Sequence, residues 1–484
     1  MHEGPTPRPE TSLRVRASRG TTAILVGQMA AQILRLLGNL ALSRLLFPEA
    51  FGLAALVSLV LFGLEQVFNL GVQASIVRHE RGDERRFVDT AWTIQVVRGV
   101  ALWIGGIALA PLLARFYGQE QLTELVRVAS FAAVLLGLTS TKLFILTRRL
   151  ELERRVAIEL LSQVAALVFM VAFAWWQRSV WALVLGGLVN QASIVVLSHL
   201  WLPGPGNRFA WDAEAARELF SFGGWVFASS GLSFLANQFE LALLGRLIPA
   251  GPLGVYSVGA MIPNLLRDVL GRFAMSVLGP ALSETHREKG SSVPSRYAAA
   301  RRVTLPGGLL LGLAAAITAP AFFHKLYDPR YADAGWIAQL ALLRFWFSYL
   351  QVTGCSTLLA LGDARTWVVS SAVGTVGVAA GCLLGFEIGS LSGVLVGTAI
   401  GMAASWAVPA FQLRRRGLAS PLPELGYTVL GALLAVLALG AGPLLGPALG
   451  IEDASLRTLA AGLAVVIPFG LWVARRVLGV ARLV

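Results

Sequence analysis

Long apolar segments are the feature that most restricts how this chain can fold. Residues 366–386, for example, read TWVVSSAVGTVGVAAGCLLGF without a single charge. A helix that crosses a bilayer needs about 20 such residues. Only 14% of the 484 residues are charged and 56% are hydrophobic, whereas charged residues make up about a quarter of a soluble domain. The sequence therefore predicts an all-α polytopic membrane protein.

The apolar segments predict about fourteen transmembrane helices, separated by short polar connections. An even number of spans places both termini on the same side of the membrane. The expected spans cover residues 21–43, 52–77, 88–113, 123–146, 156–176, 180–202, 218–245, 253–284, 303–323, 334–361, 366–386, 392–413, 425–446 and 458–476.

The distribution of basic residues indicates the orientation. If the N-terminus is cytoplasmic, 26 of the 40 lysines and arginines fall in cytoplasmic segments and 7 fall in outside segments. This bias is typical of membrane proteins, whose cytoplasmic loops retain positive charge. It predicts that both termini are cytoplasmic, and it explains the net charge of +13 without nucleic-acid binding.

The sequence offers little for catalysis or for a cofactor. Cys355 and Cys382 both lie in apolar segments and predict neither a disulfide nor a metal site. The five histidines lack metal-ligand spacing, and no phosphate-binding Walker loop is present. We therefore expect a protein that is not an enzyme and that holds no metal and no cofactor.

A repeated motif divides the chain into two halves. SRLLFPEAFGL at residues 43–53 matches GRLIPAGPLGV at residues 245–255 with a shift of 202 residues. Further along, APLLARFYG at residues 110–118 resembles APAFFHKLYD at residues 319–328. Two matches in the same order predict two homologous six-helix lobes, followed by two extra helices. In the first copy, Pro48 and Gly52 predict a turn between two helices on the outer side of the membrane.

The repeat predicts a domain organisation. The expected parts are a basic cytoplasmic leader at residues 1–20, a first lobe at 21–202, a cytoplasmic linker at 203–217, a second lobe at 218–416 and two extra helices at 417–484. Six spans return the chain to its starting side, so the repeats are parallel. Transporters built from parallel repeats bind their substrate between the halves and expose it alternately to each side.

Several motifs resemble those of a known family. The segments NQFELALLGR (237–246), PLGVY (252–256), GPALS (279–283) and LYDPRYADA (326–334) are similar to those of polysaccharide flippases of the Wzx and WzxC type. SRLLFPEAFGL also looks like the first-hairpin signature of these proteins. They belong to the multidrug/oligosaccharidyl-lipid/polysaccharide exporter superfamily. The resemblance extends to about residue 415. Glu240 departs from it, because many relatives have Asp there.

The resemblance implies a function. A flippase of this type moves an undecaprenyl-pyrophosphate-linked oligosaccharide from the cytoplasmic to the periplasmic leaflet of the bacterial inner membrane. The product serves the biosynthesis of O-antigen, exopolysaccharide or another surface polysaccharide. The implied partners are the lipid-linked oligosaccharide itself, a polysaccharide polymerase, a chain-length regulator and a coupling H⁺ or Na⁺.

Charged and polar residues inside the predicted spans indicate where a substrate would bind. A charge in hydrocarbon costs at least about 2.5 kcal/mol and usually faces a polar interior. Many such residues lie on the first two helices of each half, which we expect to face each other across a cleft. The candidates for the substrate cavity are Gln32, Arg35, Asn69, Asn237, Gln238, Asn264, Arg267 and Arg272.

Arg35 and Arg267 are the first candidates to bind a diphosphate, because a planar guanidinium can bind two oxygens at once. Glu65, Glu240 and Asp268 are candidates for coupling or ion pairing. An equally weighted alternative pairs Arg35 with Glu65, and Arg267 with Asp268 or Glu240. Arg344 also lies well inside a predicted span. We expect Arg98, Arg127 and Lys142 either to lie in the interior or to extend from span ends toward the headgroups.

Three other functions remain open. A drug or cation antiporter of the same superfamily would have twelve helices and an acidic pocket. A peptidoglycan lipid II flippase would share the fourteen helices and a cationic cavity. A membrane polysaccharide polymerase or ligase is more distant, because such enzymes usually need a large periplasmic loop.

Overall fold

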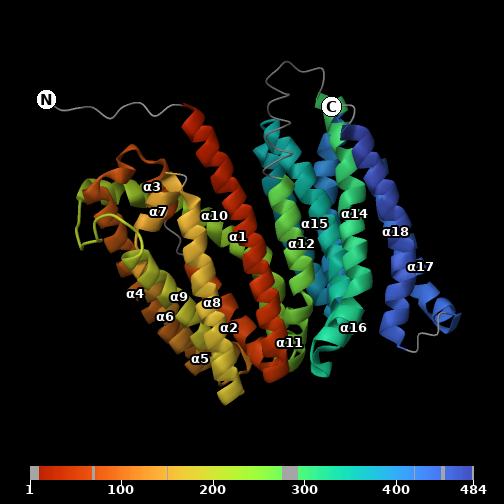
Figure 1. The fold of residues 1–484 in the computed structure, drawn as a ribbon, viewed down its shortest axis with the longest axis horizontal. Helices are drawn as coiled ribbons and strands as arrows, with labels where there is room; N and C mark the ends of the chain where they lie inside the picture. The colour runs from red at the N-terminus through yellow and green to blue at the C-terminus, as the bar shows by residue number, and fades with distance from the viewer. Residues whose placement is uncertain are drawn as a thin grey trace. The chain divides into compact units, whose positions relative to one another are not determined.

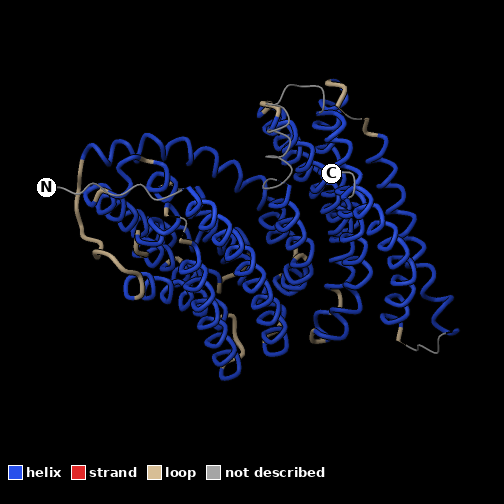
Figure 2. Tube along the Cα trace, turned by 45° about the horizontal axis from the view of Figure 1, so that its top comes forward, coloured by secondary structure: helices blue, strands red, loops and turns tan. Residues whose placement is uncertain are grey.

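The fold was analysed in a computed structural model that describes residues 10–67, 71–149, 151–274, 293–418, 420–448 and 453–481. These residues form helices and short connections and contain no strand (Figure 2). An apolar segment in a lipid environment has no water to bind its N–H and C=O groups, and a helix satisfies these groups within the segment. The predicted all-helical class is confirmed.

The chain divides into two compact units. Unit 1 comprises Met1–Leu235 and Leu244–Gly254, and unit 2 comprises Ala236–Leu243 and Val255–Val484. Within the described residues, unit 1 contains the following helices (Figure 1): α1 (Glu10–Leu45), α2 (Pro48–Val67), α3 (Val72–Arg78), the 3-10 helix η1 (Glu80–Asp83), α4 (Arg85–Tyr117), α5 (Leu122–Ala129), α6 (Phe131–Leu138), α7 (Lys142–Arg148), α8 (Leu152–Trp176), α9 (Trp181–Leu200) and most of α10 (Ala213–Leu247).

Unit 2 contains the later helices. They are the second half of α11 (Ala250–Gly259), then α12 (Met261–Phe273), α14 (Val293–Leu326), the 3-10 helix η3 (Pro329–Tyr331), α15 (Ala334–Ala360), α16 (Ala364–Arg415), α17 (Leu422–Ala448) and α18 (Ala454–Ala481). The predicted lobes at residues 21–202 and 218–416 remain predictions.

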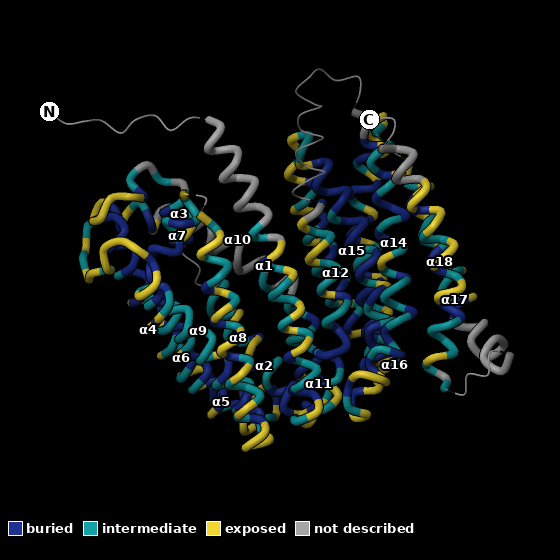
Figure 3. The backbone as a smooth tube through the Cα atoms, in the orientation of Figure 1, coloured by how far each residue is buried: buried dark blue, intermediate teal, exposed yellow. Residues whose placement is uncertain are grey.

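The helices have the length and surface of membrane spans. Seven helices of the described residues are long and apolar enough to cross a membrane. The bent segment from Leu122 to Arg148 would make an eighth span. Exposed positions recur along these helices (Figure 3). They include large apolar side chains such as Val168 on α8 and Ile400 on α16. Such surfaces are unfavourable in water and suit a lipid environment. The chain is therefore a multi-pass membrane protein.

The predicted span at residues 123–146 is not one straight helix. It is broken into α5, α6 and α7, and the last part bends by 58°. At the second break, the Ser140 N–H donates to the Ser198 hydroxyl at 3.1 Å. Gln95 donates to the carbonyls of Leu136 and Gly137 at 2.9 and 3.3 Å. Side chains thus bind the backbone groups that the break would otherwise leave unsatisfied.

The two copies of the repeated motif contact each other within unit 1. A Cβ on Gly52 would collide with the carbonyl of Ala250, and a Cβ on Gly254 would collide with the carbonyl of Pro48. The first stretch ends α1 and begins α2, and its second copy ends α10 and begins α11. The predicted turn at Pro48 is confirmed, while Gly52 lies inside α2 and permits a close approach of two backbones.

Helix α16 is a hairpin of two arms. Its backbone leaves helical geometry at Gly389 and Ser390, where φ of Ser390 is 50°. This break falls between the predicted spans 366–386 and 392–413. The arms pack through six glycines, which we call the glycine ladder. Its opposed pairs are Gly377 with Gly401, Gly381 with Gly397 and Gly385 with Gly393. A Cβ at any of these positions would collide with the backbone of the opposite arm.

The two ends of α16 are tied together by one carboxylate. Asp363 caps the first turn by accepting from the Thr366 N–H at 3.1 Å, and it also pairs with Arg416 beyond the last turn. Partial burial alone would raise the pKa of Asp363. The bonds from Thr366 and the charge of Arg416 outweigh that effect and lower the pKa below its ordinary value.

The glycine ladder predicts that Gly381→Ala is destabilising. The added methyl must push the two arms apart, and overpacking of this kind costs about 1–3 kcal/mol. Gly307→Ala on α14 is the matched control, because among the described residues no atom beyond its chain neighbours and its own helix backbone lies within 4 Å of its Cβ position. Thermal unfolding of the purified protein should show a lower Tm for Gly381→Ala and an unchanged or higher Tm for Gly307→Ala. Equal Tm values would contradict a tight contact between the arms.

The Asp363 bonds predict a specific pH dependence. Because the folded pKa is depressed, the carboxylate stabilises the fold above the unfolded value of about 3.9, and this contribution is lost as the pH falls through the folded pKa. Asp363→Asn should lower Tm at pH 7. The difference in Tm from the parent protein should shrink as the pH falls below about 4, and a difference that does not shrink at any acidic pH at which the protein still folds would refute the assignment.

Candidate functional site

A polar cavity lies within unit 2. The empty space among its lining atoms is about 410 Å³, a volume that includes open solvent. Helices α10, α11, α12, α15 and α16 contribute its walls. The lining residues are Glu240, Tyr256, Ala260, Pro263, Asn264, Arg267, Ala341, Arg344, Phe345, Ser348, Leu395 and Thr398. Three of the predicted site residues (Glu240, Asn264 and Arg267) are thus brought together.

An ion pair with a buried carboxylate lines this cavity. The Glu240 side chain on α10 is 5% exposed, and one of its oxygens contacts a guanidinium nitrogen of Arg344 on α15, whose side chain is 18% exposed. That carboxylate oxygen has no hydrogen bond within the described part of the chain. The guanidinium charge is therefore what compensates it, because a buried carboxylate without a partner is strongly unfavourable.

Helix α12 places further polar groups on the cavity. Asn264 is exposed and Arg267 is half-buried, so both can be reached from outside the protein. Arg267 and its neighbour Asp268 lie 3.9 Å apart with both side chains partly exposed, a geometry that contributes little. Arg267 is therefore weakly held and can reorient toward a ligand. The prediction that Arg267 pairs with Asp268 or Glu240 is confirmed for Asp268, whereas Glu240 pairs with Arg344.

The chemistry of the cavity suits a ligand with both anionic and hydroxyl groups. Two guanidinium groups, Arg267 and Arg344, line one space. Ser348, Thr398 and Tyr256 add hydroxyls, and Asn264 adds an amide. Arginine binds phosphate oxygens in pairs, while hydroxyl and amide groups donate to and accept from sugar hydroxyls.

Unit 1 contains the predicted charges Arg35 and Glu65, and their pairing differs from the expectation. Arg35 is exposed on α1, and its Nε donates to Gln32 of the same helix at 3.2 Å. Glu65 on α2 is accompanied instead by Arg98, whose guanidinium donates to the Glu65 carbonyl at 3.0 Å. The alternative that pairs Arg35 with Glu65 is therefore wrong. Arg98 lies near the middle of α4, and its positive charge can neutralise Glu65 on α2.

The remaining predicted residues are less defined. Asn69 lies outside the described residues. Asn237 belongs to α10, but its side chain falls outside the described part. Gln238 is half-buried on α10, and Arg272 is exposed on α12.

The other basic residues of the spans behave differently from one another. Arg127 is exposed on α5. Lys142 is buried. Its ammonium donates to the carbonyls of His199 and Leu202, at 3.3 and 3.0 Å, and so satisfies the end of α9.

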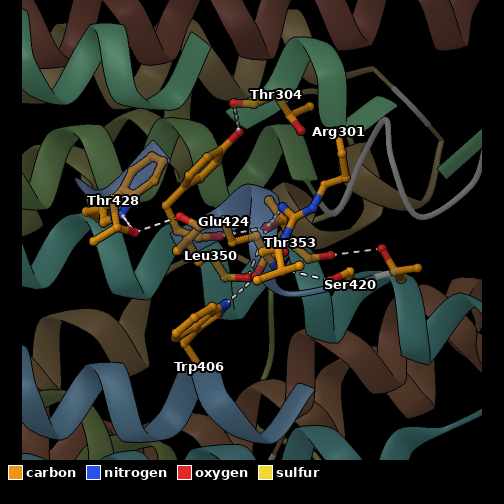
Figure 4. A network of polar contacts seen from close by, with 12 residues as sticks. Arg301, Thr304, Leu350, Thr353, Trp406, Ser420, Glu424 and Thr428 are labelled. Atoms are coloured by element: carbon orange, nitrogen blue, oxygen red, sulfur yellow. Dashed lines mark hydrogen bonds and ion pairs between the residues drawn. The ribbon is translucent and has the colours of Figure 1, made fainter. Parts of the chain in front are cut away.

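A second buried ion pair lies in unit 2, and the sequence did not reveal it. Arg301 on α14 pairs with Glu424 on α17 and donates to the Thr353 hydroxyl at 2.7 Å (Figure 4). Trp406 on α16 donates to the other Glu424 oxygen. This network fastens α17 to three neighbouring helices. Arg301 was expected in a cytoplasmic loop, because the predicted span began at residue 303. It was therefore not considered among the charges inside the spans.

Arg344 is the site residue that sequence reasoning undervalued. It was noted as an arginine well inside a span, but its sequence neighbours offered no carboxylate partner. Glu240 lies 104 positions away along the chain, so the pairing depends on how α10 packs near α15. One signal in the sequence could have indicated this pair. Glu240 and Arg344 have opposite charges, and both lie deep inside predicted spans of the same half of the chain.

The buried pair predicts a non-additive effect of mutation. Arg344→Met leaves the Glu240 carboxylate buried without compensation, which costs about 3–5 kcal/mol. Replacing both residues, as in Glu240→Gln with Arg344→Met, removes the charge and should restore most of the loss. Thermal unfolding of the two variants tests this, and a double variant no more stable than Arg344→Met would contradict the pairing.

Two curated bacterial proteins are similar to this chain in sequence. The teichuronic acid biosynthesis protein TuaB of Bacillus subtilis (strain 168) is 24% identical over 204 residues, which cover 41% of each protein. The lipopolysaccharide biosynthesis protein WzxC of Escherichia coli (strain K12) is 24% identical over 285 residues, which cover 57% of this chain and 55% of WzxC. The chain thus matches about half the length of these relatives or less. The WzxC match confirms the resemblance predicted from the motifs.

Solved structures share the fold. The lipid II flippase MurJ in an inward closed conformation matches with a TM-score of 0.67 and 12% identity, covering 94% of this chain and 99% of MurJ. An inward-facing multidrug resistance MATE family transporter of the MOP superfamily matches with a TM-score of 0.62 and 15% identity, covering 80% of this chain and 94% of the transporter. At these identities the likeness concerns the fold alone.

A family model described as "Polysaccharide biosynthesis protein" matches residues 41–312. This segment includes both copies of the repeated motif, the α10 segment that carries Glu240 and the α12 residues of the cavity. It covers more than half of the chain, which therefore belongs to the polysaccharide biosynthesis protein family.

Proposed function

We propose that this protein moves a lipid-linked oligosaccharide, carried on undecaprenyl pyrophosphate, from the cytoplasmic to the periplasmic leaflet of the bacterial inner membrane. The observation that carries the proposal is the unit 2 cavity, in which two arginines and several hydroxyl and amide groups line one space. A diphosphate needs the arginines, and a sugar needs the uncharged polar groups.

The family and the membrane surface support the same conclusion. The chain belongs to a polysaccharide biosynthesis family, and its described helices expose apolar side chains along their length. A polysaccharide precursor is too polar to cross a bilayer unaided, so its biosynthesis needs a protein that shields the sugar. We further propose that the chain has fourteen spans and that both termini are cytoplasmic. Movement of the two halves would expose the substrate alternately to each side of the membrane.

The charge of the cavity argues against an antiporter for organic cations. Such a protein needs a carboxylate that is available to the cation. The carboxylate that lines this cavity, Glu240, is already compensated by Arg344. The arginines of the cavity favour an anionic substrate instead.

An arginine substitution tests the proposed substrate contact. Arg267→Ala should lower polymer export by a factor of at least about ten, because it removes charge-assisted bonds to the diphosphate in the unit 2 cavity. Export is measured as surface polysaccharide in a deletion strain that carries the variant.

The matched control is Arg178→Ala, which removes an exposed arginine from the connection between α8 and α9. It should export normally. Membrane fractions must contain equal amounts of both variants. Normal export by Arg267→Ala would contradict the proposed diphosphate contact.

A further inference from the structure

We propose that Arg344 is an internal counter-ion that exchanges partners during transport: it leaves Glu240 for the anionic group of the substrate, and Glu240 takes up one proton. This inference rests on the proposed function, because it names how the same cavity would receive a diphosphate.

The first observation is the imbalance within the buried pair. Arginine has five N–H donors in a planar fork. Within the described part of the chain, the one polar partner recorded for the Arg344 side chain is Glu240. The guanidinium also lines the cavity and is more exposed than the carboxylate, at 18% against 5%. Arg344 therefore has donors left to bind a ligand in the cavity while its carboxylate partner stays buried.

The second observation is where a diphosphate would meet positive charge. Arg267 lines the same cavity, and its contact with Asp268 is long at 3.9 Å and partly exposed. A diphosphate bound by Arg267 would reach Arg344 as the next cation in the cavity. Two arginines binding one diphosphate give a stronger contact than either arginine alone.

The third step is the fate of Glu240. If Arg344 turns to the substrate, the carboxylate stays buried without its compensating charge, and an isolated buried carboxylate is neutralised by protonation. The charges balance at each stage. Before exchange, Glu240 and Arg344 neutralise each other. After exchange, protonated Glu240 is neutral and Arg344 neutralises one charge of the substrate. Release of the substrate returns the proton to water and restores the pair.

Other titratable groups near the pair do not replace Glu240 in this role. Arg267 and Asp268 lie on α12, and Tyr256 lines the cavity from α11. Cys382 of α16 is close enough to interact electrostatically with both Arg344 and Tyr256. Of the two carboxylates, Asp268 is exposed, at 48% of its side chain, and water can solvate its charge. Glu240 is the carboxylate that cannot keep its charge without a partner.

This inference predicts a linked proton. The probe is inorganic pyrophosphate, bound to the full-length protein in lipid nanodiscs and followed by titration calorimetry in two buffers of different ionisation enthalpy. The parent protein should take up about one more proton per pyrophosphate than Glu240→Gln, since the amide cannot be protonated. Comparing the two proteins cancels the titration of pyrophosphate itself.

Affinity should follow the same logic. Glu240→Gln frees Arg344 permanently, so it should bind pyrophosphate more tightly than the parent protein at high pH, and the difference should shrink as the pH falls. Arg344→Lys keeps the charge but loses the fork, and it should bind about tenfold more weakly. Glu387→Gln is the matched control, because Glu387 is an exposed carboxylate of α16 outside the cavity. It should behave like the parent protein.

The outcomes separate the inference from the proposed function. Equal proton uptake by the parent protein and Glu240→Gln, weaker binding by Glu240→Gln, or no binding of pyrophosphate at all would overturn the exchange. A variant that fails to fold is recognised by size-exclusion chromatography, and the double variant Glu240→Gln with Arg344→Lys then supplies the comparison. If export needs this protein but the proton difference is absent, the exchange alone is wrong. If the lipid-linked oligosaccharide crosses normally without the protein, the proposed function is wrong.

Discussion

The rest of this structure depends on the need to satisfy backbone polar groups where no water is available. Unbroken helices meet this need by themselves. Where a helix breaks, as between α6 and α7, side chains such as Gln95 and Ser198 bind the freed groups. Where two backbones approach closely, as in the glycine ladder of α16, glycine removes the side chains that would keep them apart. The same requirement therefore fixes both the helices and the places where they may bend.

Charges in such an interior follow a related rule, because each must find compensation within the protein. Glu240 finds it in Arg344, Glu424 in Arg301, and Lys142 in the carbonyls at the end of α9. These groups differ in access. Arg301 and Glu424 are enclosed by four helices and suit a structural role. Arg344 lines an open cavity and so suits binding. Burial alone thus does not make a charge a candidate for binding, whereas a place beside a cavity does.

Much of the fold could be predicted from the sequence, because apolar length and helix breakers act locally. The segments 21–43 and 156–176 lie within single helices, the segment 334–361 matches α15 to within one residue, and the break in α16 falls between two predicted spans. The bend at Ser140 could not be predicted, since the groups that stabilise it come from α4 and α9. The repeat at Gly52 and Gly254 was visible in the sequence. Its reciprocal contact was not, because it depends on tertiary packing.

The candidate site was predictable in part for the same reason. The sequence identified Glu240, Asn264 and Arg267 by their charge or polarity inside apolar spans, and all three line one cavity. It could not choose their partners. Arg35 bonds to Gln32 on its own helix, Glu65 is accompanied by Arg98, and Glu240 is paired with Arg344. Pairing across helices is decided by how they pack, which a single sequence does not reveal.

The central claim is that this protein carries a lipid-linked oligosaccharide across the membrane. The most direct test is a leaflet-resolved assay of undecaprenyl-pyrophosphate-linked oligosaccharide in a strain that lacks the protein. The account predicts that the intermediate accumulates in the cytoplasmic leaflet and that the parent gene restores its appearance in the periplasmic leaflet. An unchanged distribution between the leaflets in the deletion strain would contradict the account.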